Sequence, residues 1–293
     1  MLKFVYKKTE YSWEEWHKQK NSFISNLELP KELIISPLII SFAAVHDPGY
    51  SIAMYKMSEL YHVIASARFA LIQAYEKFYD SNIVLREQSY VAQTWMRSQF
   101  LKNSILWYNS CIDYICQILW FGFDMHGKNI SEYVKSKEDF REMLKKVTFG
   151  AVKNKLETIK HKNEYAKKLL ERLENYGEKD NDVKFIKNIA NAIKHRGNIG
   201  FKGIDSSSPI SYENKVTGFD LEYIEPDILD IDETVERLAR VHRKLISLAK
   251  YINHFMNFDA MFKCDKEGNI LFNEAKDPKE YKKIVISNQK QNN

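Results

Sequence analysis

Residues Val183–Gly203, VKFIKNIANAIKHRGNIGFKG, carry the pattern from which the fold class is inferred. When this stretch is placed on a helix at about 100° per residue, aliphatic side chains fall on one side and a polar set falls on the other. The aliphatic positions are Val183, Ile186, Ile189, Ala190 and Ile193, and the polar positions are Lys184, Asn188, Asn191 and His195. The stretch is therefore predicted to be an amphipathic helix that packs on one side and faces outward on the other.

The outward side of this predicted helix is positively charged. The stretch contains no Asp or Glu, and its basic residues are Lys184, Lys187, Lys194, Arg196 and Lys202. Such a surface suits phosphate binding. Asn191 and His195 lie four residues apart and can meet on it, and an imidazole there could transfer a proton near neutral pH. The alternative is a solvated helix side on which His195 and Arg196 only complement the helix dipole.

The same helical period recurs through most of the chain. With 293 residues and 44% hydrophobic content, the chain is long enough to bury a large core. Ser12 and Glu15 have the spacing of a capping box, which predicts a helix start. Besides the helix described above, at residues 183–196, four long helices are predicted at residues 50–79, 83–122, 153–176 and 233–257. We therefore predict an all-α, up-down helical bundle with long helices and minor β structure around residues 215–225 and in the tail.

Turn-forming residues divide the chain into three predicted regions. Proline and glycine punctuate the sequence up to Pro48-Gly49. Residues 1–48 are predicted to form an N-terminal extension that packs on the bundle, and residues 49–260 the bundle itself. Residues 261–293 are predicted to form a C-terminal tail with a short β-turn.

Residues Asn191–Arg196, NAIKHR, resemble the motif of the HEPN superfamily, the "higher eukaryote and prokaryote nucleotide-binding" domains. In the ribonuclease members of that family, an Arg precedes a polar residue, three variable residues and a His. Asn191 matches the polar position and His195 matches the His, whereas Ala190 occupies the position of the Arg. The helical pattern that fits the family runs from about Val84 to about Met256. The chain is thus similar to an uncharacterised bacterial HEPN-like group with a degenerate motif.

The resemblance implies a nucleotide- or RNA-binding protein. In an active member it implies metal-independent RNA cleavage through the 2′-hydroxyl, as in a defence or toxin–antitoxin system. His195 would transfer a proton, Asn191 would position the phosphate, and Arg196 or Lys187 would offset charge. Phosphate binding would involve Lys184, Lys187, Asn188 and Lys194. The family commonly dimerises with the motif near the two-fold axis, so a homodimer is expected.

The departure at Ala190 supports a second hypothesis of a different class. A HEPN-like domain that lacks the catalytic Arg could serve as a protein-interaction or scaffold module. Fold analogy alone does not assign a function, so both hypotheses stay open.

Three polar residues lie beside the apolar stripe of the predicted helix 83–122. Asn109, Asp113 and Gln117 succeed one another at i+4 steps. One interpretation is hydrogen bonding between helices at the edge of the core. The other is that Asp113 supports the site by orienting His195, which requires the two helices to pair.

Metal, cofactor and membrane sites are not predicted. The cysteines form no zinc-type pair, and Glu59 and His62 have di-iron spacing without the second copy that such a site needs. Asp113 interrupts the longest apolar run, where a charge would be costly in a bilayer. The N-terminus has no signal-peptide pattern. We therefore expect a cytoplasmic protein with no cofactor, no metal and no membrane contact.

Overall fold

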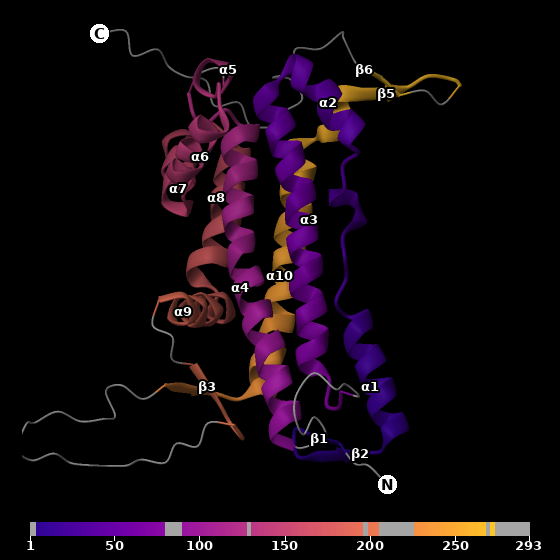
Figure 1. The fold of residues 1–293 in the computed structure, drawn as a ribbon. Coiled ribbons are helices and arrows are strands. Elements are labelled where there is room, and N and C mark those ends of the chain that lie inside the picture. The colour runs from indigo at the N-terminus through magenta and orange to yellow at the C-terminus, as the bar shows by residue number, and fades with distance from the viewer. Residues whose placement is uncertain are drawn as a thin grey trace, which may run out of the picture. The chain divides into compact units, whose positions relative to one another are not determined.

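The all-α prediction is confirmed by a computed structural model (Figure 1). The structure describes residues 4–79, 90–127, 130–195, 199–204, 226–267 and 270–272. The helices are α1 (Trp13–Ser25), α2 (Pro37–His46), α3 (Pro48–Tyr75), α4 (Tyr90–Gly122), α5 (Ile130–Tyr133), α6 (Lys137–Lys146), α7 (Phe149–Ile159), α8 (Glu164–Glu174), α9 (Asn181–His195) and α10 (Ile231–Met256).

The strands form two-stranded pairs. An antiparallel pair joins β1 (Phe4–Tyr6) to β2 (Thr9–Tyr11), and a parallel pair joins β3 (Ile199–Phe201) to β4 (Asp227–Leu229). A second antiparallel pair joins β5 (Phe262–Cys264) to β6 (Ile270–Phe272). This last pair flanks the predicted tail turn, of which residues 268–269 lie outside the described residues.

The chain divides into two compact units by its internal contacts. The first comprises Met1–Glu28, Ala65–Asn109 and Asn181–Arg243, and the second comprises Leu29–Ile64, Ser110–Asp180 and Lys244–Asn293. Each unit thus contains segments that are far apart in sequence. The predicted three-region division at residues 48 and 260 stays a prediction.

An aromatic cluster lies at the centre of the first unit. Tyr75 stacks on Phe23 and on Trp16, with ring centroids 3.9 and 5.0 Å apart. Tyr6 meets Tyr75 edge-on at 5.4 Å. Aromatic pairs in these arrangements stabilise a fold beyond the area that they bury. The cluster therefore joins the β1–β2 hairpin and α1 to the end of α3.

A charged triad is also largely buried in the first unit. Asp232 accepts hydrogen bonds from Lys77 Nζ at 2.6 and 2.8 Å and from Arg97, whose Nε donates to the carbonyl of Ala74 at 2.9 Å. Burial, followed by the nearby Arg97, lowers the pKa of Lys77 to about 8. Burial opposes ionisation of Asp232, but Arg97 and Lys77 hold the pKa of Asp232 below its usual range. One carboxylate therefore compensates two cations.

His242 is fully buried in the same unit. Its Nδ1 lies 2.8 Å from the hydroxyl of Tyr108, and its Nε2 lies 2.7 Å from the carbonyl oxygen of Glu28. A carbonyl can only accept, so Nε2 carries the proton and Nδ1 accepts from the Tyr108 hydroxyl. Burial lowers the pKa of His242 to about 4. The imidazole is therefore neutral at physiological pH.

The predicted capping box at the start of α1 is confirmed. The Ser12 side chain accepts from the backbone N–H of Glu15, and the Glu15 carboxylate accepts from the backbone N–H of Ser12. Each bond satisfies an amide that the helix itself cannot pair.

Removing this cap should loosen α1 locally. Ser12→Ala is expected to reduce the free energy that protects α1 from opening by about 1 kcal/mol, because an N-cap side chain contributes that much. Hydrogen–deuterium exchange of α1 peptides would measure the change. Ser12→Asp keeps a capping oxygen and should leave exchange unchanged. Equal exchange in all three proteins would contradict the prediction.

In the second unit, side chains of α3 and α8 contact α10. The Tyr50 hydroxyl donates to the carbonyl of Met256, and the Arg172 guanidinium lies 3.8 Å from the centre of the Tyr251 ring. An α-carbon substituent at Gly122 would come within 2.1 Å of the Met256 side chain. A larger residue at this position would therefore require the end of the Met256 side chain to move.

The predicted helix at residues 153–176 is wrong as a single element. The structure contains α7 and α8 instead, separated at residues 160–163. Asn163 starts α8 by accepting hydrogen bonds from the amides of Tyr165 and Ala166 at 2.9 and 3.1 Å. A capping Asn competes with helix continuation, which explains the break. The predicted strand at 215–225 lies outside the described residues.

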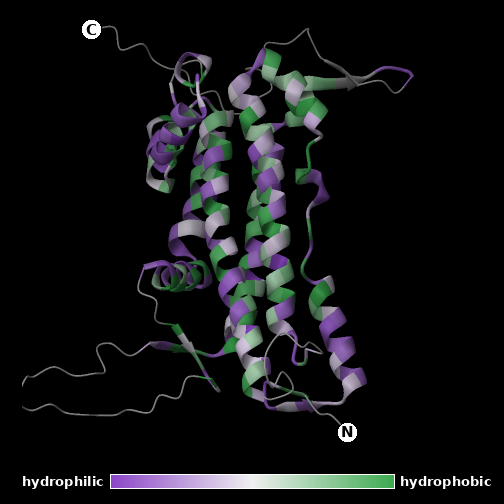
Figure 2. Ribbon diagram, in the orientation of Figure 1, coloured by the Kyte–Doolittle hydropathy of each residue, from purple (hydrophilic) through white to green (hydrophobic). Residues whose placement is uncertain are grey.

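Hydrophobic and hydrophilic residues alternate along the long helices (Figure 2). Among the helices in the described part of the chain, none combines the length and the apolar character needed to cross a membrane.

Candidate functional site

Helix α9 is amphipathic, as its sequence predicts. Its inward side buries Ile186, Ile189, Ala190 and Ala192. Its exposed side carries Lys184, Lys187, Asn188, Asn191, Lys194 and His195. Six of the predicted site residues therefore share one solvent-facing surface, which we call the α9 polar side.

The α9 polar side contains the two residues of the motif that match the HEPN pattern. Asn191 and His195 are both exposed and one helical turn apart. Lys194 and His195 lie in the last turn of α9, where the helix dipole favours positive charge. Arg196, the next predicted site residue, lies outside the described residues.

Ala190 is the residue that aligns with the catalytic Arg in the predicted resemblance to HEPN ribonucleases. It is fully buried on the packing side of α9. A long cationic side chain at this point would face the core and not the α9 polar side. Any positive charge for a reaction there would have to come from another position, such as Lys187.

Asp182, the only acidic residue of α9, is neutralised by α10. Its two carboxylate oxygens each accept a hydrogen bond of 2.8 Å from Arg240, one from Nε and one from Nη2. Such a two-point pair fixes both direction and distance. Because this carboxylate is already paired, it does not offset the lysines of the α9 polar side.

A second contact also fixes α9 against α10. The guanidinium of Arg237 lies 4.4 Å from the centre of the Phe185 ring, within the range of a cation–π interaction. Arg237 also pairs with Glu233 at 2.9 Å. These contacts join the packing side of α9 to the acidic start of α10.

Asp113 is exposed and belongs to the second unit, whereas His195 belongs to the first. The suggestion that Asp113 orients His195 stays a prediction.

Within the described residues, no three His, Cys, Asp or Glu side chains converge as a metal site would require.

The arginines of α10 are functional residues that were not predicted from the sequence. Arg237 and Arg240 hold α9 in place, and Arg243 lines a pocket on the first unit. Their spacing of three residues places them near one another on the helix surface. The spacing can be seen in the sequence and indicates a shared helix surface. It does not indicate which residues of other elements these arginines contact.

Comparisons with known proteins add no relative. The chain matches no protein-family model, no curated protein and no solved structure.

Proposed function

We propose that the α9 polar side binds RNA through its phosphate groups. The observation that carries this proposal is the exposure of three lysines, two amides and one imidazole on one side of a helix whose only carboxylate is occupied by Arg240. Lysines on an exposed surface bind phosphates and release counterions. Amide and imidazole groups add hydrogen bonds that can orient a phosphate.

The resemblance to HEPN ribonucleases extends this proposal to RNA cleavage. A 2′-hydroxyl would attack the neighbouring phosphorus, the bond from phosphorus to the 5′-oxygen would break, and a 2′,3′-cyclic phosphate would form. His195 would transfer the proton from the 2′-hydroxyl to the leaving oxygen. Asn191 would position the phosphate and Lys187 would offset its charge. By the same resemblance, we expect a homodimer. The odd count of cysteines and the N-terminal sequence lead us to expect a cytoplasmic location.

Binding to RNA should depend on the lysines of α9. Replacing Lys184 and Lys187 together by Gln is expected to weaken binding to single-stranded RNA and to reduce the slope of log affinity against log salt by about 1.4. The reason is that each lost phosphate contact reduces this slope by about 0.7. Fluorescence anisotropy across a salt series would measure both effects.

The matched control is Lys162→Gln combined with Lys167→Gln, which removes two exposed lysines near α7 and α8. This variant should keep the wild-type slope. If both double variants lose the same affinity, binding reflects overall charge and the α9 polar side is not the site.

Cleavage is tested separately from binding. Wild-type protein is expected to cleave RNA in the presence of EDTA, and His195→Ala should abolish cleavage while retaining salt-sensitive binding. Cleavage that persists in His195→Ala would contradict the catalytic role of this residue.

The burial of Ala190 favours a second candidate function. With no Arg available at this motif position, the α9 polar side could serve protein interaction instead of catalysis. Absence of both cleavage and salt-sensitive RNA binding in the wild-type protein would support this scaffold role and refute the RNA proposal.

A further inference from the structure

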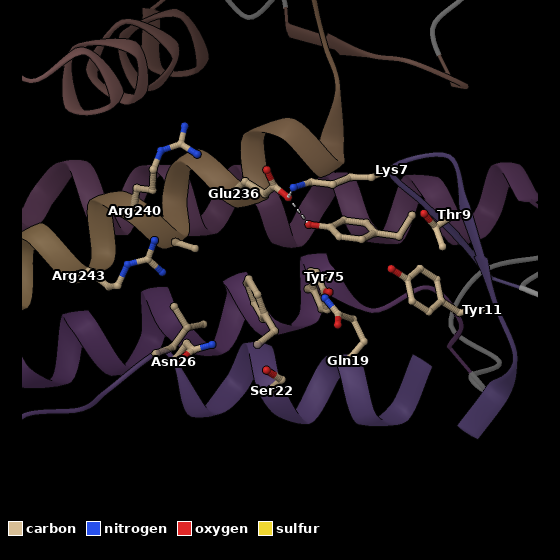
Figure 3. Close-up of a pocket in the computed structure, with 14 residues that line it drawn as sticks. Lys7, Thr9, Tyr11, Gln19, Ser22, Asn26, Tyr75, Glu236, Arg240 and Arg243 are labelled. Carbon is tan, nitrogen blue, oxygen red and sulfur yellow. Dashed lines mark hydrogen bonds and ion pairs between the residues drawn. The ribbon is translucent and has the colours of Figure 1, made fainter. Parts of the chain in front are cut away.

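A separate pocket of about 420 Å³ lies on the first unit, between the β1–β2 hairpin, α1, the end of α3 and α10 (Figure 3). Arg243 and Asn26 lie toward one end, and Lys7, Thr9 and Tyr11 lie toward the other. This volume is in the usual range for a small-molecule site. The pocket does not include α9, so it is independent of the RNA proposal.

Tyr75 presents an unusual hydroxyl to this pocket. Its ring is 1% exposed and is fixed by stacking on Phe23 and Trp16. The hydroxyl is buried and lies beside the Gln19 side chain, outside the geometry of a full hydrogen bond. Burial is the largest influence on the pKa of Tyr75 and raises it to about 12, whereas hydrogen bonding by the Gln19 side chain acts to lower it. The group therefore remains an O–H donor, and leaving it unpaired costs free energy.

Polar side chains on α1 face the same space. Gln19, Ser22 and Asn26 all line the pocket, and Phe23 lies among them. Their spacing of three and four residues puts them on one side of the helix. Gln19 interacts with the Tyr75 hydroxyl, and Ser22 and Asn26 form no side-chain hydrogen bond among the described residues. Amides and hydroxyls of this kind can donate to, and accept from, the hydroxyl groups of a ligand.

The charges around the pocket favour an anion. Of the lining residues, Lys7, Arg240 and Arg243 are cationic and Glu236 is anionic. Glu236 is occupied by Lys7 and by the Tyr6 hydroxyl, which donates at 2.5 Å, and Arg240 is held by Asp182. Arg243 is exposed and has no acidic partner within the described residues. Its planar guanidinium suits a phosphate or carboxylate.

We propose that this pocket binds a small polyhydroxylated anion, either a sugar phosphate or a sugar acid. Arg243 binds the anionic group. The Tyr75 hydroxyl, Gln19 and Ser22 bind the hydroxyl groups of the ligand body. Its polar lining argues against a predominantly apolar ligand.

Isothermal titration calorimetry with four probes tests whether the pocket requires both the anionic group and the hydroxyl groups of the ligand. Ribose 5-phosphate and gluconate represent the two anion classes, while ribose lacks the anion and inorganic phosphate lacks the polyol. We expect at least one of the first two to bind, and ribose and inorganic phosphate to bind at least tenfold more weakly. Binding by neither full probe would overturn the proposal, as would equal binding by either fragment.

Two substitutions locate the ligand in the pocket. Arg243→Gln is expected to weaken binding about tenfold or more, because a hydrogen bond to a charged group is lost. Lys250→Gln removes the same charge from α10 outside this pocket and should leave the affinity unchanged. If Arg243→Gln binds as tightly as wild type, the anion is not held at this position.

Tyr75→Phe gives a signature that a purely structural tyrosine would not. Removing a buried hydroxyl that lacks a full hydrogen bond should leave the melting temperature of the ligand-free protein unchanged or raised, yet weaken ligand binding about fivefold. Tyr79→Phe is the control, because the Tyr79 hydroxyl donates to the carbonyl of Gln73 outside the pocket. That variant should lose stability and keep its affinity. A destabilised Tyr75→Phe with unchanged affinity would overturn the proposal.

Discussion

Asp232→Asn is expected to reduce the free energy of unfolding of the first unit by about 3–5 kcal/mol, because removing one partner of a buried ion pair leaves uncompensated charge. In this protein the substitution leaves two cations without their partner, because the Asp232 carboxylate pairs with both Lys77 and Arg97. Urea denaturation followed by tryptophan fluorescence would measure the change. Trp13, Trp16, Trp95 and Trp107 all lie in the first unit, so the signal reports mainly on that unit.

Two further variants sharpen this experiment. Asp227→Asn makes the same substitution at an exposed position of β4 and should change stability by no more than about 0.5 kcal/mol. Adding Lys77→Met to Asp232→Asn removes one of the unpaired cations and should recover part of the loss. If Asp232→Asn is as stable as Asp227→Asn, the triad does not stabilise the fold.

Acidification should destabilise the first unit through His242. The pKa of this buried imidazole is about 4 in the folded protein, against 6.5 for an unperturbed His. Between these values the unfolded chain binds more protons than the folded chain, so stability is lost as the pH falls. The contribution is complete above pH about 6.5, and up to about 3 kcal/mol is lost by pH about 4.

A comparison with His242→Gln isolates this effect from the titration of carboxylates. The variant should be less stable than wild type near pH 7, and the difference should shrink as the pH is lowered, because only the wild type must protonate or expel this imidazole. His254→Gln replaces an exposed histidine of the same helix and should follow the wild-type pH dependence. Parallel stability curves for wild type and His242→Gln would contradict the prediction.

Local patterns were sufficient to predict much of the helical structure. The amphipathic period of α9 and the capping box of α1 are both encoded within a few residues. The break between α7 and α8 was also encoded locally, by the capping Asn163, but the leucine pattern on both sides obscured it. An N-cap residue inside a continuous apolar stripe is therefore worth testing as a helix boundary.

The buried polar sites could not be predicted, because their partners are remote in sequence. Only the positions of Tyr108 and Glu28 show that His242 is a neutral core residue. The role proposed for Tyr75 depends on the polar residues of α1 and α10 that line the same pocket. Neither set of contacts produces a periodic pattern in the sequence from which it could be predicted.

The interleaved order of the two units has a consequence for synthesis on the ribosome. Residues 4–28 belong with Asn181–Arg243, and the contact between Glu28 and His242 spans 214 residues. The β1–β2 hairpin and α1 can pack on α3 early, but their contacts with α10 cannot form until α10 has been synthesised. Contacts of such long range slow folding and leave early segments exposed, so the nascent chain should depend on chaperones for longer than a consecutive two-domain protein of equal length.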